Sequence, residues 1–176
     1  MKLAAVVLTA LALPRVAAAA DGESALSVSA GAGTFVMPGE EDDETIAPTA
    51  GGVLGVAYEK GFAEAWSWRL ELDGALYGGG GLSYSATVAA GIVYRFDVLK
   101  YVPYGLLELG GVIGGGGPVP EADSPVLAPV LQIGGGLDIL KSRDRSWGVE
   151  ARVATFLDDV TTFSLSGRYT WRWGWF

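Results

Sequence analysis

The side chains that could do chemistry in this chain are its carboxylates and guanidiniums, because its 176 residues include no His and no Cys. The missing Cys excludes disulfides, thiol nucleophiles and zinc–thiolate sites. The charged residues often alternate with apolar ones, as where Leu70 and Leu72 separate Arg69, Glu71 and Asp73. A spacing of two places the charges on one face of a β-strand and the apolar side chains on the other.

When the same alternation is followed through the other strands, ten charged residues fall on the polar face. If the strands close into a barrel with the apolar face outward, these charges line its interior. Five are positive and five are negative, and we expect them to pair, because an isolated buried charge is very costly. An eight-stranded barrel has interior space for little more than side chains, which favours a plugged lumen over an open channel. The predicted lumen charge network is Arg69, Glu71, Asp73, Arg95, Glu108, Asp138, Glu150, Arg152, Arg168 and Arg172.

A second candidate site is the acidic run Glu40, Glu41, Asp42, Asp43 and Glu44. Carboxylates are ligands that calcium prefers, so a divalent-cation site is one interpretation. The run lacks the spacing of a known cation loop, however, and consecutive charges are usually solvated. The glycine runs do not fit a phosphate loop, since no Lys-Ser or Lys-Thr follows them. We therefore expect no cofactor and no enzymatic activity.

These side chains must be positioned by strands, because the apolar residues recur with period two. The alternating segments are about ten to fifteen residues long, which suits strands that cross a membrane at a tilt. Turn residues separate the segments. The prediction is an all-β fold, a single eight-stranded antiparallel up-and-down transmembrane β-barrel. Its strands are expected at about 26–36, 51–60, 66–77, 82–96, 103–114, 127–140, 146–157 and 162–175.

The N-terminus is typical of a secretory signal peptide. Lys2 precedes the apolar run 3–13, and the small residues 17–20 form a cleavage site before Asp21. We expect residues 1–20 to be removed and residues 21–176 to form the barrel domain. The formal net charge is −8, and loss of Lys2 and Arg15 makes it −10, which disfavours nucleic acid as a partner.

Aromatic residues cluster at the ends of the predicted strands, where amphipathic rings suit the interface between lipid and water. The rim opposite the tryptophans is expected to carry Phe35, Tyr77, Tyr84, Phe156 and Phe163. Two girdles around an aliphatic band predict outer-membrane lipid as a partner. The predicted periplasmic girdle contains all six tryptophans: Trp66, Trp68, Trp147, Trp171, Trp173 and Trp175.

The alternating strands, Tyr104-Gly105-Leu106 after Pro103, and the closing segment 163–176 together resemble the OmpA/OmpX-like class of small outer-membrane barrels. The resemblance covers about residues 25–176. It implies that Phe176 is the terminal signal recognised by the barrel-assembly machinery. The class usually places further hydrophobic residues two, four and six positions before that Phe, whereas Gly174, Arg172 and Thr170 stand there.

Three functions fit these features. The first is a non-enzymatic scaffold of the bacterial outer membrane that contacts an unknown surface partner through loops 37–50 and 115–126. The second is a narrow pore or transporter for small or hydrophobic molecules, against which the small lumen argues. The third is a soluble exported lipocalin-like binder, against which the charged interior argues, because an apolar cavity needs apolar inward faces.

Overall fold

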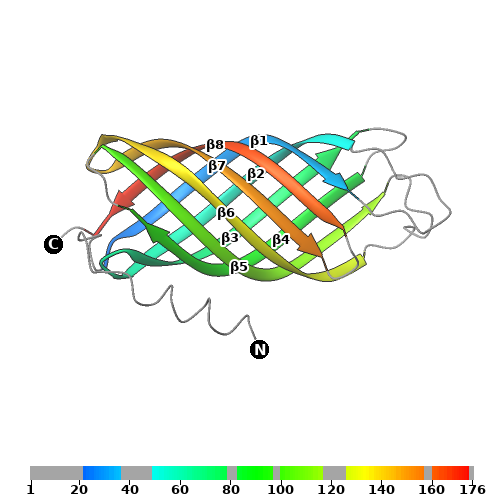
Figure 1. Ribbon diagram of the computed structural model, residues 1–176, viewed down its shortest axis with the longest axis horizontal. Coiled ribbons are helices and arrows are strands. Elements are labelled where there is room, and N and C mark those ends of the chain that lie inside the picture. The colour runs from blue at the N-terminus through cyan, green and yellow to red at the C-terminus, as the bar shows by residue number, and fades with distance from the viewer. Residues whose placement is uncertain are drawn as a thin grey trace, which may run out of the picture.

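The computed structural model describes residues 22–36, 49–78, 83–96, 100–116, 126–156 and 160–174. Eight long strands run at a steep tilt around a cylinder (Figure 1). Long alternating segments favour this arrangement, since a closed barrel requires tilted strands. The strands are β1 Ser24–Val36, β2 Thr49–Ala63, β3 Trp66–Tyr77, β4 Ser83–Arg95, β5 Tyr101–Gly116, β6 Val126–Ser142, β7 Arg145–Phe156 and β8 Thr161–Trp173.

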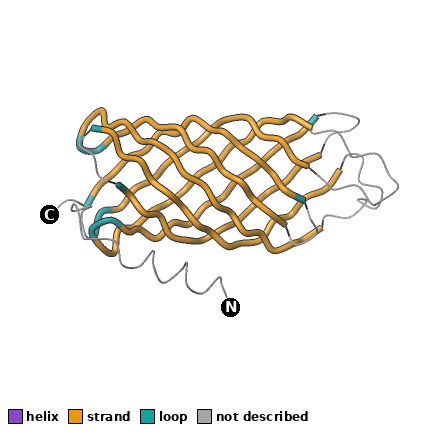
Figure 2. The backbone as a smooth tube through the Cα atoms, viewed as in Figure 1, coloured by secondary structure: helices purple, strands orange, loops and turns teal. Residues whose placement is uncertain are grey.

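The sheet is closed and antiparallel, with each strand hydrogen-bonded to its neighbours in chain order. β8 closes the ring against β1, from the pair Ser24 and Trp173 to the pair Val36 and Thr161. Figure 2 shows the continuous ring of strands. This confirms the predicted eight-stranded up-and-down barrel. We call the end where β1 begins and β8 finishes the terminal end, and the other the opposite end.

Strand boundaries differ from the predicted ones by a few residues. β8 finishes at Trp173 rather than at 175, because Gly174 takes a φ of 88°, which leaves the extended conformation. β5 begins before Pro103, whose carbonyl accepts a hydrogen bond from the Phe96 amide at 2.8 Å. Proline therefore does not mark the start of this strand.

The outer surface of the barrel is apolar, and its interior is mainly polar, with a few apolar clusters. Leu54, Leu109 and Leu165 are 67%, 65% and 62% exposed, whereas many charged residues are buried. Burial alternates along β3 in the predicted phase, with Arg69 inward and Leu70 outward. Such an inside-out distribution suits apolar surroundings, since in water the exposed leucines would gain nothing from folding. In the part of the chain that the structure describes, no helix is long and apolar enough to cross a bilayer.

The aromatic residues at the opposite end differ from expectation. Phe35 and Tyr77 point inward, with ring centroids 5.1 Å apart, and pack with Val53 and Ala75. Phe156 packs against another interior cluster, which leaves Tyr84 and Phe163 as the outward members of the predicted set. The predicted girdle at this end is therefore wrong for three of its five residues. Strand ends here are apolar on both faces, so the phase cannot be read from them.

Candidate functional site

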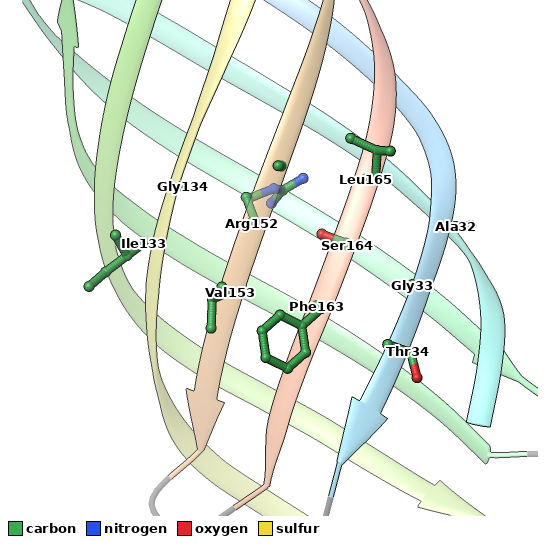
Figure 3. Close-up of a pocket in the computed structure, with 11 residues that line it drawn as sticks. Ala32, Gly33, Thr34, Ile133, Gly134, Arg152, Val153, Phe163, Ser164 and Leu165 are labelled. Atoms are coloured by element: carbon green, nitrogen blue, oxygen red, sulfur yellow. The ribbon is translucent and has the colours of Figure 1, made fainter. Parts of the chain in front are cut away.

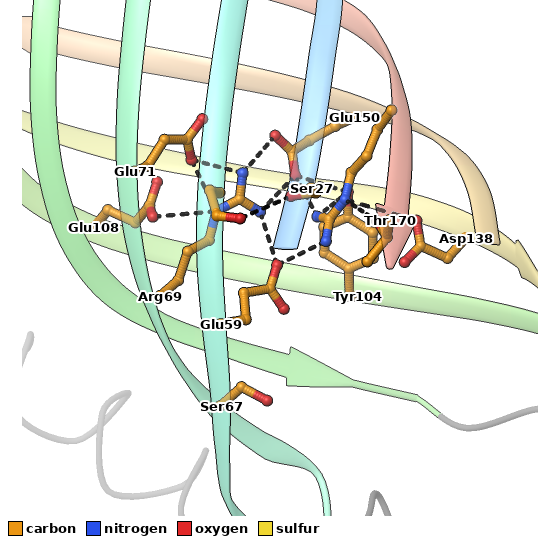
Figure 4. A network of polar contacts seen from close by, with 12 residues as sticks. Ser27, Glu59, Ser67, Arg69, Glu71, Tyr104, Glu108, Asp138, Glu150 and Thr170 are labelled. Carbon is orange, nitrogen blue, oxygen red and sulfur yellow. Dashed lines mark hydrogen bonds and ion pairs between the residues drawn. The ribbon is translucent and has the colours of Figure 1, made fainter. Parts of the chain in front are cut away.

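The ten residues of the predicted lumen charge network all point into the barrel. Eight are buried, and the side chains of Asp73 and Arg95 retain 11% and 12% exposure. They come from β3, β4, β5, β6, β7 and β8. Figure 4 shows five of them in the interior: Arg69, Glu71, Glu108, Asp138 and Glu150. The structure thus brings together side chains up to 81 positions apart in sequence.

Glu150 on β7 is the centre of the network and is 1% exposed. Arg69 donates to it through two nitrogens, at 2.8 and 3.0 Å. Arg168 donates at 3.0 Å, the Tyr104 hydroxyl donates at 2.7 Å, and Nε of Arg152 lies 3.0 Å away. These charge-assisted contacts replace the water that burial removes.

Arg69 is shared among four carboxylates. Besides Glu150, its guanidinium lies 2.6 Å from Glu71, 3.4 Å from Glu59 and 3.4 Å from Glu108. Figure 4 shows these side chains surrounding the Arg69 head group. A guanidinium has five N–H donors in a fixed plane, so one arginine can serve several carboxylates.

A second arginine, Arg152, extends the network toward the opposite end. It donates to both oxygens of Asp73, at 2.8 and 3.2 Å, and to the Gln132 amide oxygen at 3.3 Å. Its Nη1 also lies 2.5 Å from Glu71. A small cavity of about 40 Å³ lies beside Asp73 and Arg152, which is room for a few water molecules.

The network also extends to the terminal end. Arg168 donates to Glu59 at 2.7 Å and its guanidinium lies 4.9 Å from the centre of the Tyr104 ring. Arg172 donates to Asp138 at 2.7 Å and lies 3.2 Å from Glu23, just before β1. Burial raises the pKa of the Glu23 carboxyl, and the positive charge of Arg172 opposes this shift.

Sequence reasoning missed Glu59. It points inward from β2, is 1% exposed, and pairs with Arg69, Arg95 and Arg168. Small apolar residues occupy both faces of β2 before it, so the alternation gave no clear phase. The larger residues Leu54, Val56 and Tyr58 all have even numbers, which was the available signal. With Glu59, the described interior holds six carboxylates and five guanidiniums, so the expected balance is wrong by one negative charge.

Inward glycines make room for the large charged side chains. A Cβ on Gly134 would lie 2.6 Å from Cγ of Arg152, and one on Gly91 would lie 2.7 Å from Cγ of Glu108. Both distances are too short for real carbon contacts. Glycine in a strand often marks such a close approach, which explains part of the high glycine content.

The tryptophans of the predicted girdle that the structure describes lie at the terminal end. Trp68, Trp147, Trp171 and Trp173 point outward, with exposures between 39% and 59%. Trp147 and Trp171 form edge contacts with Tyr169, with ring centroids 4.7 and 4.5 Å apart. Some members of the predicted sites lie outside the described residues: the leader 1–20, the acidic run 40–44, Trp175 and Phe176.

The outer surface that the described residues form offers no comparable polar site. An apolar depression of about 760 Å³ lies over β1, β6, β7 and β8, lined by Ala32, Ala151, Ile133, Phe163 and Leu165 among others. Figure 3 shows Ile133, Phe163 and Leu165 around it. Arg152 lies at its floor but uses its guanidinium inside the barrel. In the described ranges, moreover, no group of three or more carboxylates is arranged to hold a metal ion.

Comparison with known proteins shows the fold and not the activity. No family model matches the sequence, and no curated protein matches it either. Among solved structures, Neisserial surface protein A (NspA) is similar with a TM-score of 0.70 at 11% identity, over 86% of this chain and 99% of that one. Ail, the attachment invasion locus protein of Yersinia pestis, is similar with a TM-score of 0.61 at 18% identity, over 88% of this chain and 100% of that one.

A third similar structure is the outer membrane enzyme PagL, with a TM-score of 0.51 at 16% identity, over 83% of this chain and 97% of that one. Identities this low carry no conclusion about activity, since one fold supports many functions. The chain therefore has the fold of the small eight-stranded outer-membrane β-barrels, the OmpA/OmpX-like class that its sequence resembles.

Proposed function

We propose that this protein is a non-enzymatic scaffold of the bacterial outer membrane, with a lumen plugged by its charge network and with surface contacts made by its outer loops. Export, cleavage of the leader near Ala20 and recognition of Phe176 by the barrel-assembly machinery belong to this proposal. The opposite end would then face the cell exterior and the terminal end the periplasm.

The observation that carries the proposal is a set of ion pairs that join opposite walls of the barrel. In a ring of eight strands, β3 and β7 are as far apart as two strands can be, yet Arg69 on β3 binds Glu150 on β7 at 2.8 Å. Arg152 on β7 likewise forms an ion pair with Asp73 on β3. Side chains that meet from opposite walls leave little room for a solute between them, which supports a plug.

The outward faces support a membrane location. Leucines at mid-strand suit hydrocarbon, and the tryptophans at the terminal end suit the interface. Outer-membrane lipid is therefore the proposed partner of the outer surface. Fractionation tests this directly, because the alternative of a soluble lipocalin-like binder requires the protein in the periplasmic extract.

The lack of enzymatic activity is supported by the chemistry of the interior. The chain has no His or Cys. Glu150, at the centre of the network, already accepts hydrogen bonds from Arg69, Arg168 and Tyr104 and lies 3.0 Å from Arg152. A carboxylate held in this way is a poor general base. PagL shows that the fold can carry an enzyme, so activity assays on lipid and peptide substrates remain the check.

The surface partner is proposed to be cationic. The segments that join strands at the opposite end carry five acidic residues in 37–48, two in 117–125 and two in 157–159, and no Lys or Arg. A surface with a negative electrostatic potential attracts positively charged partners and repels negatively charged ones. Binding to immobilised polycations, lost at high salt, is expected, whereas binding to sulfated polysaccharides would contradict this part.

Conductance tests the plug. Purified wild-type protein in planar bilayers is expected to give no reproducible steps, whereas the double variant Arg69→Ala, Glu150→Ala is expected to conduct. Lys60→Ala, at an exposed outward position on β2, is the matched control and should stay silent. Reproducible steps from the wild type would overturn the plug in favour of the narrow pore. Heat-modifiable gel mobility verifies that each sample is folded.

A further inference from the structure

The lumen network contains one carboxylate more than it has arginines. Among the described interior residues, Glu59, Glu71, Asp73, Glu108, Asp138 and Glu150 face Arg69, Arg95, Arg152, Arg168 and Arg172. Glu23 also forms an ion pair with Arg172, at 3.2 Å, so the interior lacks at least one positive charge. A buried group of this composition needs another cation to be neutral.

The surplus charge can be assigned to one residue by counting contacts. Glu108 is fully buried, and neither of its oxygens accepts a hydrogen bond from any residue that the structure describes. Its one ion-pair contact is Nε of Arg69 at 3.4 Å, and that nitrogen already donates to Glu71 at 2.8 Å. By contrast, Glu150 accepts four hydrogen bonds.

The surroundings of Glu108 place a second carboxylate beside it. Figure 4 shows Glu71 and Glu108 next to each other on one side of Arg69. Oε1 of Glu71 likewise accepts no hydrogen bond, although it lies 2.5 Å from Arg152. Glu71 therefore presents a carboxylate oxygen near Glu108, whose one cationic contact among the described residues is Arg69 at 3.4 Å.

We propose that the Glu108 carboxyl group is a proton-binding site, occupied at neutral pH, and that its O–H donates to Glu71. One bound proton makes the six carboxyl groups and five guanidiniums neutral as a set. It also converts a buried anion that accepts no hydrogen bond into a hydrogen-bond donor with an acceptor beside it, which is how two adjacent carboxylates share a site.

The other groups around Glu108 do not remove the need for the proton. Four charged groups interact electrostatically with the Glu108 carboxyl group: Arg69 and Glu71 on β3, and Glu150 and Arg152 on β7. Its cross-strand partners, Gly91 on β4 and Gln132 on β6, do not titrate. Both arginines are engaged by carboxylates at 3.0 Å or less, so neither is available to neutralise Glu108.

Infrared spectroscopy of the folded barrel in vesicles at pH 7 tests the site. The wild type is expected to show the carbonyl stretch of a protonated, buried carboxyl group, which shifts in heavy water and decreases as the pH is raised. Glu108→Gln is expected to lose this band. Glu64→Gln, which removes an exposed carboxylate outside the lumen and leaves the interior charge unchanged, is the matched control and should keep it.

Two results would overturn the proposal: a wild-type spectrum at pH 7 without the band, or a band that persists in Glu108→Gln. A sodium ion is the competing occupant, so the wild type is also measured in sodium chloride and in choline chloride. Equal bands in both salts support the proton. A band that appears only in choline contradicts it. A wild-type spectrum without the band overturns the proposal even if a variant fails to fold, and the measurement does not depend on whether the barrel conducts.

Discussion

Glu150 and Glu108 allow one strong test of the lumen network, because both are buried inward glutamates and the same substitution is expected to affect them differently. Glu150→Gln keeps the size of the side chain but removes the negative charge between three arginines. Glu108→Gln also keeps the size, yet removes an oxygen that accepts no hydrogen bond.

The expected magnitudes follow from the contacts. Glu150 accepts four hydrogen bonds, three of them from guanidinium groups. Hydrogen bonds to charged groups contribute about 1.5–3 kcal/mol each, but the sum overestimates the loss because Arg69 retains other carboxylates. Breaking a buried ion pair by removing one partner costs about 3–5 kcal/mol, which we expect for Glu150→Gln. For Glu108→Gln we expect a change within about 1 kcal/mol.

Urea unfolding of the refolded barrels in vesicles, followed by tryptophan fluorescence, measures this difference. With an m-value of about 2 kcal/mol per molar urea, the midpoint of Glu150→Gln should fall by about 1.5–2.5 M. The midpoint of Glu108→Gln should move by about 0.5 M or less. Equal shifts for the two variants, or a larger shift for Glu108→Gln, would refute the assignment of Glu150 as the centre.

Three further tests address the faces and the packing of the barrel. Leu72→Arg should impair membrane insertion by about 2–4 kcal/mol, whereas Ser85→Arg, on the inward face, should fold far better, as vesicle refolding yields will show. Gly134→Ala should destabilise the barrel by about 1–3 kcal/mol in urea, because its Cβ would lie 2.6 Å from the Arg152 side chain. Gly167→Ala, whose Cβ would have its nearest contact at 3.8 Å, should be neutral in the same assay. Trp68→Ala should reduce fluorescence quenching by lipids brominated near the headgroup, while brominated chain ends should quench both proteins equally weakly.

Much of the fold could be predicted because the two faces of each strand meet different surroundings. In β3, apolar and charged residues alternate from Trp68 to Asp73, so both the strand and its phase can be read from the sequence. Alternation gives no phase where both faces are small or apolar, as in the first half of β2. There Val53 points inward and Leu54 outward, and only side-chain size separates them.

The interior site was predictable as a set but not as a network. Alternation assigns Arg69 and Glu150 to the lumen, yet nothing local indicates that they meet, because they lie 81 positions apart. That contact depends on barrel closure and strand register. The same limit applies to Glu108, whose lack of partners follows from the competition among carboxylates for Arg69 and cannot be read from its own strand.

The charge network has a mechanical role that the backbone ladder cannot supply. Backbone hydrogen bonds join only neighbouring strands, so β3 and β7 share none. The pairs Arg69 with Glu150 and Arg152 with Asp73 connect these two walls directly. In water such pairs add little, because solvation of the separated charges competes with them. Inside a barrel surrounded by lipid, separation would leave each charge unpaired and shielded from solvent, so the network should hold the cross-section rigid and make unfolding cooperative.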